Sequence, residues 1–102
     1  MTFEKFVAHL QEKLPNHPDF SSFIRNVEKR HSASAIVHLS RQTSGKEIEL
    51  LKNFLLQKSS EYQLDDEERM LSLHVDQIGK KVHLSRILRE VMHADGKRKP
   101  RL

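Results

Sequence analysis

The chain of 102 residues contains no cysteine and no tryptophan, and it has only three glycines. Without cysteine it can form neither disulfides nor thiolate sites, which fits a reducing compartment. The isolated Gly45, Gly79 and Gly96 cannot build a glycine-rich phosphate-binding loop. The sequence also lacks the apolar runs of a membrane span or a secretion signal. We therefore expect a cytoplasmic protein that does not enter a membrane.

The positive charge of the chain is concentrated at one end. The formal net charge is +4, from 18 Lys and Arg against 14 Asp and Glu. Four of the basic residues lie in the last six positions, so residues 1–96 hold 14 basic against 14 acidic residues. A basic tail on a neutral body concentrates attraction to polyanions on that tail. We expect one helical domain over residues 1–96 and a flexible basic tail over 97–102.

The first quarter of the chain predicts two helices. Apolar residues recur at steps of three and four over residues 3–14 and again over 20–27, which is the spacing of one helix face. Thr2 is a suitable N-cap for the first helix, and Pro15 ends it. We expect the two segments to form an αα-hairpin whose aromatic faces meet.

The middle of the chain contains the strongest helix prediction. Residues 32–41 fit a short helix or a short buried strand, and their length does not decide between the two. Ser44 and Glu47 have the spacing of a capping box, in which each side chain bonds a backbone N–H of the first turn. Apolar residues at helical spacing extend this helix to about Tyr62.

The acidic run 65–68 favours a further helix. Asp65 and Glu68 repeat the capping-box spacing, and carboxylates suit the positive end of a helix better than they suit a metal ion here. The apolar residues of 71–78 would continue that helix, and a last helix would run from near Leu84 to Gly96. The favoured fold is therefore mainly α, a compact bundle of four or five short helices.

A β-hairpin is the alternative for the same region. Leu71, Leu73 and Val75 alternate at a period of two, as do Val82 and Leu84, with residues 76–80 as the loop. This interpretation gives an α+β fold. The pentapeptide Val-His-Leu-Ser-Arg occurs at 37–41 and again at 82–86. Its flanks do not match, so we interpret the repetition as coincidence, or else as a mark of two similar short elements.

The residues that carry chemistry do not form a recognisable catalytic pattern. No two of the seven histidines have the three- or four-residue spacing that places two imidazoles on one helix face. A metal site would need the fold to assemble distant residues such as His38, His74 and His83. No serine lies in a G-x-S-x-G context. We expect a protein that is not an enzyme and has no cofactor or bound metal.

Nucleic-acid binding is the function that we favour. Residues 77–92 look like a helix-turn-helix, although Arg89 or Glu90 occupies the position usually held by a buried β-branched residue. Arg86 and Arg89 would then face a major groove, while Lys80 and Lys81 would meet phosphates. The tail would add phosphate contacts that depend on salt. These tail residues are Lys97, Arg98, Lys99 and Arg101.

The alternative is a protein–protein interaction module, such as an adaptor, a chaperone-like protein or an inhibitory protein, acting as a homodimer. Apolar residues of the central helix cover more than one of its faces, which is typical of an interface. The candidate interface residues are Leu50, Phe54 and Leu56. In either case we expect a regulatory protein that forms a dimer.

Overall fold

The computed structural model describes residues 1–31, 33–76 and 80–88. Within these ranges the chain forms two α-helices, a short 3-10 turn and a four-stranded sheet. In chain order they are α1 (Phe3–Lys13), η1 (Leu14–Asn16), β1 (Ile24–His31), β2 (Ser34–Leu39), α2 (Gly45–Glu61), β3 (Arg69–Asp76) and β4 (Lys81–Leu88). The prediction of a mainly-α bundle is wrong, and the protein has an α+β fold.

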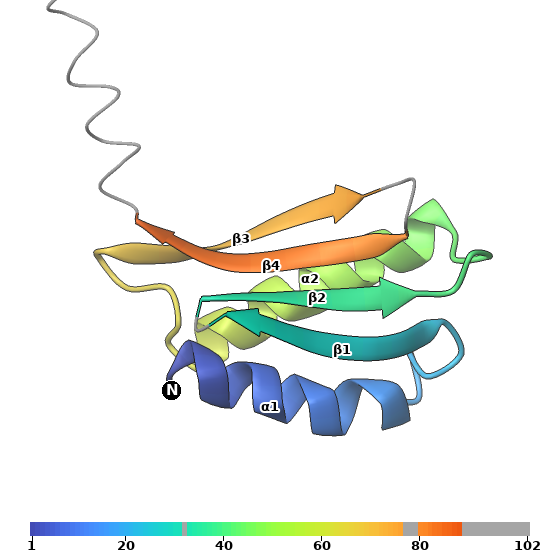
Figure 1. The fold of residues 1–102 in the computed structure, drawn as a ribbon, viewed down its shortest axis with the longest axis horizontal. Coiled ribbons are helices and arrows are strands. Elements are labelled where there is room, and N and C mark those ends of the chain that lie inside the picture. The colour runs from blue at the N-terminus through green and yellow to red at the C-terminus, as the bar shows by residue number, and fades with distance from the viewer. Residues whose placement is uncertain (32, 77–79, 89–102) are drawn as a thin grey trace, which may run out of the picture.

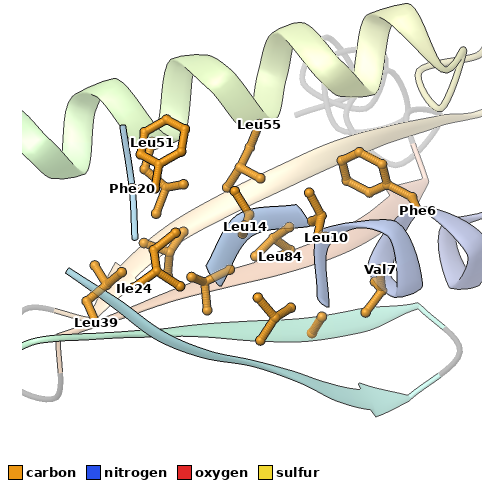
Figure 2. Packing of buried hydrophobic residues seen from close by; sticks show 14 of the residues in the cluster. Phe6, Val7, Leu10, Leu14, Phe20, Ile24, Leu39, Leu51, Leu55 and Leu84 are labelled. Carbon is orange, nitrogen blue, oxygen red and sulfur yellow. The ribbon is translucent and has the colours of Figure 1, made fainter. Parts of the chain in front are cut away.

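The sheet is antiparallel, with the strand order β1-β2-β4-β3. Figure 1 shows α1 running alongside β1 and α2 crossing behind the middle strands. Because β4 is antiparallel to both β2 and β3, those two strands are parallel and α2 connects them in a split β-α-β unit. Both helices pack on one face of the sheet, so the described residues form two layers (Figure 2).

The core fills the space between the helices and the inner face of the sheet. Leu10 of α1, Leu55 of α2 and Leu84 of β4 meet there, and each is at most 1% exposed. Figure 2 shows side chains from α1, α2 and the strands pointing into this common space. Each strand therefore has an inner face in the core and an outer face that the two helices leave uncovered.

Both helices among the described residues begin at a predicted N-cap. The Thr2 hydroxyl accepts a hydrogen bond from Lys5 N–H at 3.2 Å, and α1 ends at Lys13. At the start of α2, Ser44 Oγ accepts from Glu47 N–H at 3.2 Å, and Glu47 Oε1 accepts from Ser44 N–H at 2.8 Å. The capping-box prediction is confirmed, as is the helix at residues 3–14.

The helix predicted over residues 20–27 is wrong, because a bulge in β1 imitates helical spacing. Ile24 and Val27 are both buried although they lie three residues apart. The register of β1 against β2 shifts between Ile24 and Asn26, and this extra residue brings Ile24 and Val27 to the same face. Phe20 and Phe23 lie in the turn before the strand and pack edge to face at 5.9 Å between ring centroids.

The helices predicted over residues 71–78 and 84–96 are also wrong where the structure describes them, and the hairpin alternative is confirmed. β3 and β4 pair from Arg69 opposite Leu88 to Asp76 opposite Lys81. Asp66 caps a turn instead of a helix, and Asp65 accepts from the N–H of Leu71 in β3. Asp66 accepts from the N–H groups of Glu68 and Arg69, because a carboxylate two or three residues before a backbone N–H stabilises a turn as well as a helix start.

The helices and strands of the described residues form two α-β-β units that lie 45 residues apart. β3 begins and ends 45 residues after β1. Val37 in the first pentapeptide is directly opposite Val82 in the second, on the two central strands. The buried helix positions match at the same offset: Phe3 with Ile48, Phe6 with Leu51, Leu10 with Leu55, and Leu14 with Ser59. The pentapeptide therefore marks two equivalent strands, as the second of its two interpretations proposed.

Candidate nucleic-acid interface

The outer face of the sheet carries polar side chains at the positions that alternate with the core. Val82 and Leu84 are buried on the inner face, so Lys81, His83 and Ser85 of the same strand project outward. In the register of the sheet, His83 of β4 is opposite Ile36 of β2 on one side and opposite His74 of β3 on the other. We call this surface the open face.

A depression of about 420 Å³ lies on the open face. It spans three strands, from the end of β1 across the start of β2 to the first half of β4. Its lining contains four basic side chains and two serines, and none of its residues is acidic: Arg30, His31, Ser34, Ala35, Ile36, Lys81, His83, Leu84 and Ser85. Cationic groups next to hydroxyl donors are the chemistry that binds phosphate oxygens.

One carboxylate beside the depression, that of Glu28, is bonded to its neighbours, and a second carboxylate, that of Asp76, is on the residue directly opposite Lys81. Glu28 Oε1 lies 2.7 Å from His38 Nε2, and Glu28 Oε2 accepts from Arg30 Nη1 at 3.2 Å. The hydrogen bond from His38 lowers the pKa of Glu28, and the bond and charge of Arg30 lower it further. Arg30 nevertheless remains 51% exposed, so its remaining donors face solvent at the rim of the depression.

His38, His74 and His83 share the open face with His31 of the depression. The rings of His74 and His83 lie 6.0 Å apart between centroids, at an angle of 48°. His38 is opposite Lys81 on the neighbouring strand pair and is held by Glu28. The fold thus brings His38, His74 and His83 onto one surface. Even so, residues 1–31, 33–76 and 80–88 contain no group of three or more His, Asp or Glu side chains arranged to hold a metal ion.

The helix-turn-helix prediction is wrong, because Lys81–Leu88 is a strand. Of the residues assigned to it, Lys81 lies in the depression. Lys80, next to Lys81 in the chain, donates from Nζ to the carbonyl of Thr43 at 3.2 Å and does not line the depression. Arg86 is on the inner side, 13% exposed, and donates to Asp66 at 3.0 Å. The others lie outside the described residues: Arg89, Lys97, Arg98, Lys99 and Arg101.

The predicted interface residues on α2 do not form one stripe. Leu50 is 59% exposed and Leu56 is 44% exposed. Six residues apart, they lie about 120° from each other around the helix axis. Phe54 packs against Phe20 and His17, with ring centroids at 5.0 Å and 5.1 Å. Phe54 is therefore used in the fold, and the two leucines face different directions.

Sequence reasoning did not identify Arg30 and His31, and it named His83 only among the distant residues that a metal site would need. The helical interpretation of residues 77–92 assigned side chains to faces with a period of about 3.6 residues. In the strand β4, successive side chains instead alternate between the two faces of the sheet. The alternation of Lys81, His83 and Ser85 with the apolar Val82 and Leu84 is the signal that could have placed His83 on the outer face. Arg30 and His31 gave no comparable signal, since the second register shift of β1 falls between Lys29 and His31.

No family model, no curated protein and no solved structure matches this chain. Neither of the two described helices has the length and apolar character that crossing a membrane requires.

Proposed function

We propose that the protein is a non-enzymatic, cytoplasmic regulatory protein that binds single-stranded nucleic acid on the open face of its sheet. The observation that carries this proposal is the depression lined by Arg30, His31, Lys81 and His83 without an acidic residue. Phosphate contacts from such side chains release counterions and supply most of the affinity of a nucleic-acid-binding protein.

The shape of the surface favours a single strand over a duplex. The open face is a sheet with no recognition helix among the described residues, so it offers nothing to insert into a major groove in the manner of a helix-turn-helix. Single strands are instead bound by aromatic or histidine side chains that stack on unpaired bases beside cationic groups. His74 and His83 lie next to each other on this surface and are suited to that stacking.

We expect the basic C-terminal residues to contribute to the same binding. β4 ends at Leu88, three residues after Ser85 of the depression, at the end of the sheet where β1 also ends (Figure 1). We expect the cationic residues of the C-terminal tail to add phosphate contacts to those of Arg30 and Lys81. They are Lys97, Arg98, Lys99 and Arg101.

The test compares two double variants that remove the same charge. Arg30→Ala with Lys81→Ala changes the depression, while Arg41→Ala with Lys46→Ala removes an arginine and a lysine that do not line it. Binding of a labelled mixed-sequence oligonucleotide, as single-stranded RNA and as DNA, is followed by fluorescence anisotropy across a salt series. The first variant should reduce the slope of log affinity against log salt by about 1.4, at about 0.7 for each phosphate contact.

The control separates a site from a general charge effect. The Arg41 and Lys46 variant should keep nearly the wild-type slope. Equal losses in both variants, or no binding by the wild type at low salt, would exclude the open face as the binding site. A chain that ends at Gly96 should bind more weakly at low salt and show a shallower slope, because it lacks the basic tail.

A protein partner is the second candidate function. The exposed Leu50 lines a shallow apolar depression at the start of α2 together with Gly45, Lys46, Glu49 and Asn53. An exposed apolar surface of this kind is typical of a contact with another protein. Leu50→Lys leaves the open face unchanged, so it should abolish such a contact without changing affinity for the oligonucleotide.

A further inference from the structure

The two edge strands of the sheet differ in how they are protected. β1 has two register shifts, and Gln11 of α1 donates from Nε2 to the carbonyl of Val27 at 3.1 Å. β3 pairs with β4 without any shift over all eight of its residues. Its central residues 70–75 include no Lys, Arg, Asp or Glu. Bulges, charges and covering side chains prevent strands from adding to an edge. Residues 70–75 of β3 have no bulge and no charged side chain of their own, and Asp65 covers this edge at the N–H of Leu71.

A single hydrogen bond shows which backbone groups β3 presents at this edge. The N–H of Leu71 donates to Asp65 Oδ1 at 2.8 Å, so it points away from β4. Backbone groups of alternate residues point to the same side of a strand. The N–H and C=O groups of Leu73 and Val75 therefore face outward as well. Asp65 already occupies the N–H of Leu71, which leaves the Leu71 carbonyl for a second strand.

We propose that β3 pairs with β3 of a second copy of this chain, antiparallel and symmetric about Leu73. The two Leu73 residues then exchange N–H···O=C hydrogen bonds across the twofold axis. The Val75 N–H of each copy donates to the Leu71 carbonyl of the other. The ladder ends where the Asp65 carboxylate bonds the N–H of Leu71. The result is one continuous sheet of two copies, and it does not rest on the proposed function.

The side chains fit the same register. Leu73 and Val75 are only partly buried on the inner face, whereas Val82 and Leu84 on the next strand are 0% and 1% exposed. Pairing about Leu73 places Leu73 against its symmetry mate and Val75 against Leu71, which are favourable cross-strand pairs. A register centred on His74 would instead place two imidazoles opposite each other, and these repel when protonated. A strand-edge contact is smaller than a standard interface, so the dimer should depend on concentration.

The absence of native cysteine allows a direct test. Two residues in a hydrogen-bonded antiparallel pair have Cα atoms about 5.5 Å apart, which lies within the range of a disulfide. Leu73→Cys should therefore form a covalent dimer under mild oxidation. Val75→Cys is the matched control on the same edge, because its symmetry mate would lie about 14 Å away at roughly 3.4 Å per residue. We expect Leu73→Cys to cross-link about tenfold faster.

Sedimentation of the wild-type protein provides a second measurement that needs no variant. The mass should rise from 12.0 kDa towards twice that value as concentration increases. A wild-type chain that stays monomeric over the whole series, or equal cross-linking of Leu73→Cys and Val75→Cys, would overturn the dimer. Faster cross-linking of His74→Cys than of Leu73→Cys would overturn the register. Circular dichroism of each variant confirms that it is folded before the rates are compared.

Discussion

The two α-β-β units have the same order of elements, but different side chains cover the edge strand of each unit. In the first unit, α1 is tied across β1 by Gln11 and by an ion pair between Glu4 and Lys29 at 2.9 Å. In the second unit, α2 lies behind the middle strands, and Asp65 caps only the start of β3. Two units with the same order of elements can therefore leave one sheet edge protected against strand addition and the other accessible to it.

The helices of the two units should contribute similarly to stability, although their sequences differ. Leu10 and Leu55 occupy equivalent positions and are 1% and 0% exposed. Leu10→Ala and Leu55→Ala should each lower the free energy of unfolding by about 2–5 kcal/mol, because each leaves a cavity in the common core. Urea denaturation measures both. If one variant lost far less than the other, the two units would not share one cooperative core.

Removing a helix cap should lower the free energy of unfolding by less than removing a core leucine, and by different amounts in the two units. Ser44 and Glu47 exchange two hydrogen bonds, while Thr2 accepts one bond from Lys5. Ser44→Ala should cost about 1 kcal/mol, and Thr2→Ala should cost less because α1 has the weaker cap. Thermal denaturation of both variants gives the order. A larger loss for Thr2→Ala would contradict this ranking of the caps.

Acid should weaken the second unit through Asp66. Bonds from the N–H of Arg69, then from the side chain of Arg86 and the N–H of Glu68, lower the pKa of Asp66 below 3.8. A carboxyl with a lowered pKa stabilises the folded state above its ordinary range, and this contribution is lost as the pH falls through the folded-state value. Asp66→Asn should therefore show a smaller loss of stability on acidification than the wild type.

The matched change in the first unit is Glu28→Gln. The pKa of Glu28 is also lowered, chiefly by the hydrogen bond from His38 and further by Arg30. Its effect on acid stability should have the same sign as that of Asp66→Asn and be smaller, because two side chains bond Glu28 while two backbone groups and a side chain bond Asp66. Denaturant titrations from neutral to acidic pH compare the two. Identical curves for the wild type and both variants would show that these carboxylates do not cause the loss of stability on acidification.

The sequence allowed the helices to be predicted where capping residues and a continuous apolar stripe agree. That holds for α1 with Thr2 and for α2 with Ser44 and Glu47. It failed at β1, because the bulge places Ile24 and Val27 three apart on one face as a helix would. It failed again at Asp65 and Asp66, since the same carboxylates cap turns and helices alike.

The candidate site was less accessible to prediction than the fold. Lys81 was identified for its charge, but its neighbours in the depression come from strands that pair over long distances in the sequence. The outward direction of Arg30 depends on the register shifts of β1, and the sequence does not fix these. Arg86 was predicted to bind nucleic acid because of its charge. In the strand β4 its side chain lies on the inner side and donates to Asp66.

The central claim is that an oligonucleotide binds to the open face, and backbone amide shifts measured by NMR test it most directly. Titration with a single-stranded oligonucleotide at low salt should shift the amides of Arg30, Lys81, His83 and Ser85 while those of α1 and α2 change little. Shifts gathered around Leu50 on α2, or no shifts at saturating oligonucleotide, would contradict the account.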